Sequence, residues 1–119
     1  MASERLRQHH QALYERARDK PGAVEDHPWG DVVFKIRGKI FAFVGSPESP
    51  GVTVKVDPDE LDALLSLPFV RRASYIGRYG WISVAVTNKE TRDLALGRID
   101  DSYDVIAAKT KGGRRGASA

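Results

Sequence analysis

The amino-acid sequence predicts an α+β domain in which an antiparallel β-sheet is packed on one face by an N-terminal and a C-terminal helix. Three observations support this prediction. Both ends of the chain carry apolar residues at helical spacing, the middle carries short alternating segments, and the links between them are short. The chain has 119 residues, which suits one domain, and we expect residues 1–108 to form it. Residues 109–119 are expected to be a disordered, basic, glycine-rich tail.

The first helix is expected from residue 3 to about residue 18. Spacings of four, three and four residues place these side chains on one helical face: Leu6, His10, Leu13 and Ala17. Ser3 is a suitable N-cap, and Glu4 suits the positive end of the helix dipole. The pair Pro21-Gly22 predicts the end of the element.

The clearest strand signal surrounds the dipeptide Arg37-Gly38. The stretches on either side of it, within residues 32–44, are rich in β-branched and aromatic side chains. The glycine can adopt the positive φ that a two-residue hairpin turn needs. A register symmetric about this turn places Phe34 opposite Phe41 and directs one apolar face toward the core.

Further strands are expected at residues 52–56, 70–75 and 81–86. A short helix follows the first of them, because Asp57 is a good N-cap and Pro58 suits the first helical position. The sheet face opposite the helices is expected to be partly open and to carry mostly small or polar side chains: Lys35, Thr53, Lys55, Ser83 and Ala85.

The C-terminal region is expected to be helical in two pieces. Thr87 followed by Glu90 forms a capping pattern that begins a helix reaching about Leu96. Gly97 then predicts an interruption, and a terminal helix is expected over residues 99–108.

The composition excludes several kinds of site. The chain has no cysteine, so disulfides, thiolate metal sites and cysteine nucleophiles are excluded. Its histidines are scattered, its acidic clusters fit helix starts, and it has no nucleophile elbow or phosphate-binding glycine motif. We therefore expect no metal, no cofactor and no catalytic activity, and a protein that acts by binding. No signal peptide or membrane span is apparent, which predicts a cytoplasmic location.

The net charge of +3 is a weak indication of an anionic partner. Four basic residues lie in the last eleven positions: Lys109, Lys111, Arg114 and Arg115. Without them the chain has 15 basic and 16 acidic residues. Only a local concentration of charge can therefore attract such a partner.

Four stretches taken together resemble the MmcQ/YjbR-like proteins. They are HPWG at residues 27–30, VFKIRGKIF at 33–41, GRYGWI at 77–82 and IDDSY at 99–103. The resemblance spans residues 21–109 and implies a frataxin-like (CyaY-like) α+β fold. It also implies the "double wing" description, under which the family is regarded as DNA-binding.

Basic residues near the two expected β tips are the candidate nucleic-acid contacts: Lys35, Arg37, Lys39, Lys55, Arg71, Arg72 and Arg78. Cationic β-ribbon tips can contact a phosphate backbone, which predicts weak, salt-sensitive binding to DNA. The alternative is that these charges only keep the hairpin tips soluble and prevent edge-to-edge pairing.

Aromatic residues suggest a second hypothesis, a pocket for a small planar or anionic molecule. Its candidate lining residues are Trp29, Tyr75, Arg78 and Trp81. Against this, we expect both tryptophans to pack the ends of the sheet as part of the core. A third hypothesis is binding of a protein partner, or of a second copy, by the open sheet face. The sequence leaves the oligomeric state open.

Overall fold

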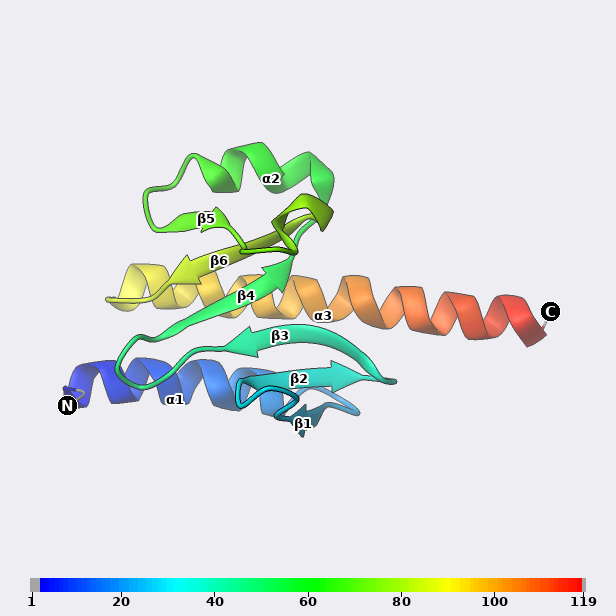
Figure 1. Cartoon of the computed structure of the whole chain (residues 1–119), viewed down its shortest axis with the longest axis horizontal. Coiled ribbons are helices and arrows are strands. Elements are labelled where there is room, and N and C mark those ends of the chain that lie inside the picture. The colour runs from blue at the N-terminus through cyan, green and yellow to red at the C-terminus, as the bar shows by residue number, and fades with distance from the viewer. Residues whose placement is uncertain (1–2, 119) are drawn as a thin grey trace.

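A computed structural model describes the backbone of residues 3–118 and the side chains of residues 3–110. The elements in chain order are α1 (Glu4–Arg18), β1 (Val24–Asp26), β2 (Val32–Ile36), β3 (Lys39–Val44), β4 (Gly51–Lys55), α2 (Pro58–Leu65), β5 (Val70–Arg72), the 3-10 turn η1 (Gly77–Tyr79), β6 (Trp81–Ala85) and α3 (Lys89–Ser118). Every paired strand is antiparallel to its neighbour, and the order across the sheet is β1-β2-β3-β4-β6-β5 (Figure 1).

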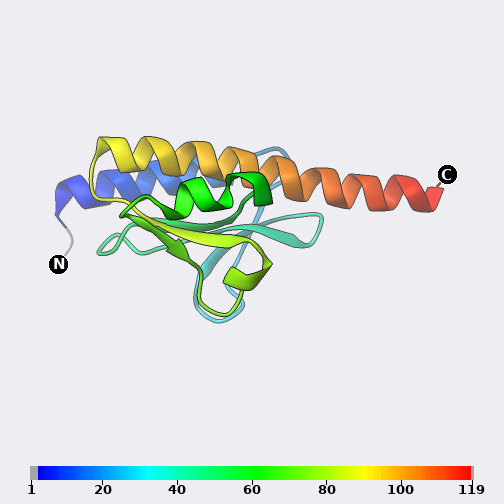
Figure 2. The same ribbon diagram turned by 90° about the horizontal axis from the view of Figure 1, so that it is seen from above.

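The sheet has one covered face and one open face. Figure 2 shows α1 and α3 side by side against the same side of the sheet. Cross-strand pairs such as Val52 with Val84 and Val54 with Ile82 point toward these helices and are buried. Leu13 of α1 and Ile99 of α3 pack onto them in one core. This arrangement confirms the predicted α+β fold with both terminal helices on one face.

The first helix begins as expected, because the Ser3 hydroxyl accepts a hydrogen bond from the backbone N–H of Leu6. Leu13 and Ala17 are buried as predicted. The predicted position of His10 in the buried face is wrong, because His9 is buried there instead and His10 is only half-buried. The buried face of α1 therefore includes His9 in place of His10.

Strand β1 was missing from the sequence prediction. It is only three residues long and its sequence, Val-Glu-Asp, has no apolar alternation. It forms because β2 offers a free edge, with Glu25 opposite Phe34. Tyr14 of α1 donates a 2.5 Å hydrogen bond to the Glu25 carboxylate, which ties this edge strand to the helix layer.

The hairpin turn is confirmed, but its predicted register is wrong. Arg37 and Gly38 both have positive φ, 50° and 82°, as a type I′ turn requires. A β-bulge after Phe34 places that residue opposite Ala42 rather than Phe41. Phe41 is the extra, unpaired residue of this bulge. Its side chain points toward the helix layer and packs edge-on against Tyr103, with the two ring centroids 5.1 Å apart.

The bulge also separates β3 from β4, and α3 bridges the gap. Pairing between these strands ends at Ala42 and Val54. Beyond that point the buried Ser102 hydroxyl accepts from the Lys55 N–H at 3.0 Å and donates to the Phe41 carbonyl at 2.6 Å. One serine thus replaces a backbone ladder bond between the two strands.

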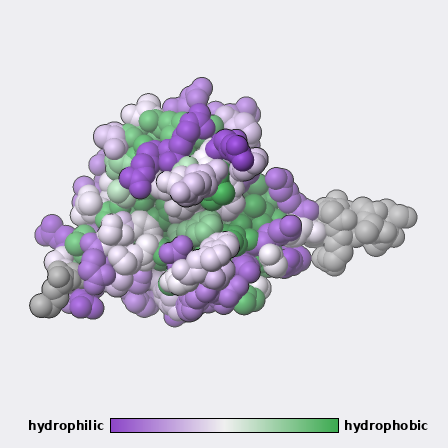
Figure 3. Space-filling model, viewed as in Figure 1, coloured by the Kyte–Doolittle hydropathy of each residue, from purple (hydrophilic) through white to green (hydrophobic). Residues whose placement is uncertain are grey.

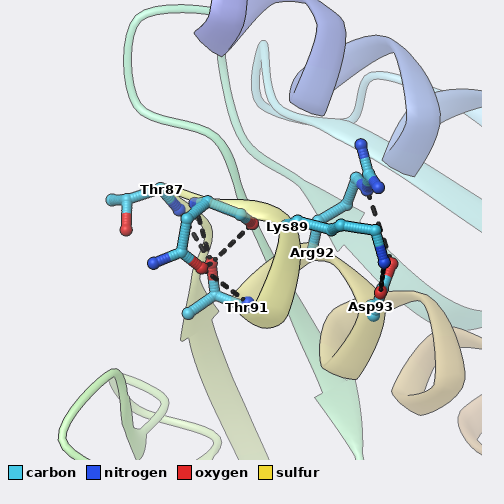
Figure 4. Close-up of polar contacts among 6 residues, drawn as sticks. Thr87, Lys89, Thr91, Arg92 and Asp93 are labelled. Atoms are coloured by element: carbon cyan, nitrogen blue, oxygen red, sulfur yellow. Dashed lines mark hydrogen bonds and ion pairs between the residues drawn. The ribbon is translucent and has the colours of Figure 1, made fainter.

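Helix α3 differs from its prediction in two ways. Asn88, not Thr87, is the N-cap: its side-chain oxygen accepts from the Thr91 N–H at 2.9 Å. Figure 4 shows Thr91 in this first turn of α3 and the ion pair of Lys89 with Asp93. The predicted interruption at Gly97 is wrong, because the helix continues through it. A glycine in a helix costs only about 1 kcal/mol relative to alanine, which packing against the sheet easily offsets.

The predicted disordered tail stays a prediction. Lys109 and Thr110 continue α3, whereas the side chains of residues 111–119 lie outside the described part of the chain. No helix within the described residues combines the length and apolar character needed to cross a membrane.

Candidate functional site

The open face of the sheet carries a groove of about 760 Å³. Its floor comes from side chains that alternate with the core residues, namely Phe43, Thr53 and Ser83. The two hydroxyl groups on this floor are hydrogen-bonded at 2.8 Å. Two loops, residues 27–31 and 73–80, project from this side of the sheet, opposite the helices (Figure 2). They form the groove's walls.

Both walls present exposed aromatic side chains. Trp29 on one loop has 77% of its surface exposed, and Tyr75 on the other has 95% exposed. Tyr75 also has a φ of 66°, which is uncommon for a residue other than glycine. A large aromatic ring held in solvent by a strained backbone is more typical of a binding loop than of a core position.

Three arginines lie on β5 and in the loop that follows it, and among them only Arg71 lines the groove. Arg71 is opposite Ser83 in the sheet, lines the groove and is exposed. Arg72 donates to the Gly77 carbonyl at 3.5 Å, and the guanidinium of Arg78 lies over the Tyr79 ring at 5.0 Å. Within residues 3–110, none of the three forms an ion pair with a carboxylate. One acidic residue, Asp31, lines the groove from the other loop.

The other predicted cations lie elsewhere and are partly engaged. Lys35 forms a 2.8 Å ion pair with Asp26 on the neighbouring strand. Arg37 donates to the carbonyl of Ala107 at 3.4 Å and to the hydroxyl of Thr110 at 3.1 Å. These two side chains therefore have structural partners, which leaves less of their charge available to an external anion.

Lys39 and Lys55 complete the predicted cationic set. Lys39 is exposed at the hairpin. Lys55 is half-buried, and its ammonium donates to the Tyr79 carbonyl. Burial lowers the pKa of Lys55, and the positive charge of Lys109 lowers it further. The predicted Arg71, Arg72 and Arg78 thus lie on β5 and its following loop, whereas Lys35, Arg37 and Lys39 lie at the β2–β3 hairpin. Lys55, on β4, lies between these two groups.

The two tryptophans have different environments. The prediction that Trp29 packs in the core is wrong, because HPWG forms an exposed turn. Trp81 is half-buried and meets the Phe43 ring edge-on at 5.9 Å. The predicted pocket residues do not all gather: Trp29 and Tyr75 line the groove, whereas Trp81 lines a second pocket and Arg78 lines neither.

The sequence interpretation missed two residues that line the groove, Asp31 and Phe43. The two glycines that flank Arg78-Tyr79 were a signal for an exposed loop. No sequence pattern indicated that loops 27–31 and 73–80 would face each other. Among the residues whose side chains are described, no three His, Asp or Glu side chains are grouped so as to hold a metal ion.

The YjbR family model matches residues 18–105 of the chain. A crystal structure of a protein from Pseudomonas syringae has a similar fold, with a TM-score of 0.63 and 20% sequence identity over 81% of this chain and 97% of that one. At that identity the likeness concerns the fold alone. None of the curated proteins matches the chain. Because the matched segment covers well over half of the sequence, the chain belongs to the YjbR family.

Proposed function

We propose that this protein is a non-catalytic DNA-binding module that prefers unpaired bases and uses the groove on the open sheet face. The observation that carries the proposal is the combination of an exposed aromatic ring on each wall of the groove with Arg71 in its lining and Arg78 in the adjacent loop. Neither arginine has a carboxylate partner among the described residues. Tyr75 and Trp29 would stack on bases, and Arg71 and Arg78 would contact phosphates.

The expected energetics are those of a weak binder. Stacking of a base on an aromatic side chain contributes about 1–3 kcal/mol, and it is tolerant of sequence because every base has a π face. Each phosphate contact to a single strand contributes about 0.7 to the slope of log affinity against log salt. The two arginine contacts therefore predict a slope of about −1.4, with little dependence on base sequence.

The test is fluorescence anisotropy of a labelled single-stranded oligonucleotide and of the matching duplex, measured across salt concentrations. The double variant Arg71→Glu/Arg78→Glu should lose at least tenfold in affinity and most of the salt slope. Trp29→Ala/Tyr75→Ala should reduce the preference for the single strand over the duplex, while the dependence of affinity on salt concentration should stay the same. Arg5→Glu/Arg7→Glu, at two exposed positions of α1 on the opposite side of the sheet, makes the same change of net charge and is the matched control.

Two outcomes would contradict the proposal. One is no binding of either oligonucleotide by the full chain at low ionic strength. The other is an equal loss of affinity in Arg5→Glu/Arg7→Glu and in Arg71→Glu/Arg78→Glu, since binding would then depend on overall charge rather than on the groove.

A second candidate function is binding of a small planar anion in the same groove. Its volume lies within the range of small-molecule sites, and Arg71 lines it together with Trp29 and Tyr75. Such a ligand would quench the emission of Trp29 in a manner that persists at moderate salt. A polynucleotide held by phosphate contacts would dissociate under those conditions, so the salt dependence separates the two functions.

A further inference from the structure

A second pocket, separate from the groove, lies where β3 and β4 part. Its volume is about 670 Å³. It is bounded by the β2–β3 hairpin, by the start of β6 and by the C-terminal half of α3, through Lys35, Gly38, Lys39, Ile40, Trp81, Ile106, Lys109 and Thr110. The strands diverge after Ala42 and Val54, so the hairpin extends away from β4 over α3. The space-filling view of this side of the molecule shows apolar surface exposed between more hydrophilic rims (Figure 3).

The walls of this pocket are fixed by contacts within the protein. Arg37 holds the hairpin tip to α3 through the Ala107 carbonyl and the Thr110 hydroxyl. Phe43 holds the Trp81 ring in an edge-on contact. A pocket whose walls are held by such contacts needs little rearrangement to receive a ligand.

The charged residues that line this pocket are all basic. Three of its lining residues are lysines and none is acidic. Asp26 neutralises Lys35, but Lys39 and Lys109 have no carboxylate partner within residues 3–110. Lys55 is close enough to Lys109 for the repulsion to affect its own protonation. Positive charges crowded against an apolar surface repel one another, and a bound anion would relieve that repulsion.

We propose that this pocket binds a small amphipathic organic anion, with an apolar, preferably aromatic, body and one acidic group. The body packs against Trp81, Ile40 and Ile106, and the acidic group lies between the ammonium groups of Lys39 and Lys109. The site shares no lining residue with the groove and does not depend on DNA binding.

The test uses 1-anilinonaphthalene-8-sulfonate as the probe and the full chain carrying Trp29→Phe, which leaves Trp81 as the only tryptophan. Titration should quench Trp81 emission and increase probe emission by energy transfer. Lys39→Gln/Lys109→Gln in that background should weaken binding at least tenfold, whereas Arg7→Gln should change it less than twofold. Uncharged N-phenyl-1-naphthylamine should bind at least tenfold more weakly than the sulfonate.

Circular dichroism and a cooperative thermal transition establish that each variant is folded, so that probe binding to a partly unfolded state is recognised. Unchanged quenching of Trp81 in the double lysine variant would overturn the proposal, as would equal affinity for the charged and uncharged probes. Oligonucleotide binding by the same double variant separates the two sites: retained DNA binding with lost probe binding supports the second site alone. Loss of both probe binding and oligonucleotide binding in the double lysine variant would also overturn the proposal.

Discussion

At the scale of single residues, His9 is buried without a hydrogen-bond partner. Both of its ring nitrogens lack a protein partner within the described residues. Burial lowers the pKa of His9 from its ordinary value, and the positive charges of Arg92 and Arg5 lower it further. The folded protein therefore holds this imidazole in its neutral form between α1 and the start of α3.

His9 should make the protein less stable in mild acid. Its pKa is lower in the folded state, so the unfolded chain binds the proton first and stability falls as the pH drops below about 6.5. His9→Leu should remove this dependence and raise the free energy of unfolding by about 1 kcal/mol, since no polar group remains unsatisfied. Urea denaturation at pH 7.5 and pH 5 measures both effects. His10→Gln, at the adjacent half-buried position, should retain the pH dependence; if it does not, His9 is not the cause.

At the scale of elements, glycines in this chain have opposite roles. Gly97 is in the middle of α3, and a β-carbon there would meet nothing within 4 Å. Gly51 is at the start of β4, where a β-carbon would lie 2.6 Å from the Val84 carbonyl oxygen. Neither space nor backbone conformation requires a glycine at position 97, whereas Gly51 permits the close approach of β4 to β6.

The two substitutions to alanine should therefore change stability in opposite directions. Gly97→Ala should stabilise the protein by about 1 kcal/mol, because alanine costs less entropy in a helix. Gly51→Ala should destabilise it, because the backbone carbonyl of Val84 must move. Thermal unfolding of both variants beside the parent measures the shifts, with an increase of about 3–5 °C expected for the first. A lower melting temperature for Gly97→Ala would show that α3 needs flexibility at this point.

At the scale of the whole molecule, one carboxylate joins the two helices that cover the sheet. Asp100 of α3 accepts from Arg16 of α1 at 2.7 and 2.9 Å and pairs with Lys20 at 2.5 Å. The hydrogen bonds from Arg16, opposed by partial burial and assisted by Lys20, lower the pKa of Asp100 to about 2. This contact links residues 84 positions apart in the chain.

Asp100 should contribute stability that is present above about pH 4 and is lost as the pH falls toward 2, because its pKa is depressed in the folded state. Asp100→Asn should cost about 1–2 kcal/mol at neutral pH, allowing for screening by solvent, and should flatten the acid limb of the stability profile. Denaturant titrations between pH 2 and pH 7 measure this. Asp104→Asn, an exposed residue on α3, should leave the profile unchanged. A similar acid limb in Asp100→Asn would contradict this role.

The candidate site was only partly predictable from the sequence. The residue types were informative: arginines beside aromatics in a glycine-flanked segment predicted an exposed loop able to contact an anion. It was not predictable which of the basic side chains have partners within the protein, because no sequence pattern distinguishes Lys35 and Arg37 from Arg71 and Arg78. Only the fold places Asp26 beside Lys35, and the end of α3 beside Arg37.

The sequence alone determined the fold class and most of the elements, because local alternation, helical spacing and capping residues are short-range properties that need no partner. Tertiary structure alone decided β1, the bulge at Phe41, the continuity of α3 through Gly97, and the burial of His9 in place of His10. Each of these depends on a neighbour distant in the sequence. The groove and the lysine pocket belong to the same category, since a cavity is the space left between segments and no single segment encodes it.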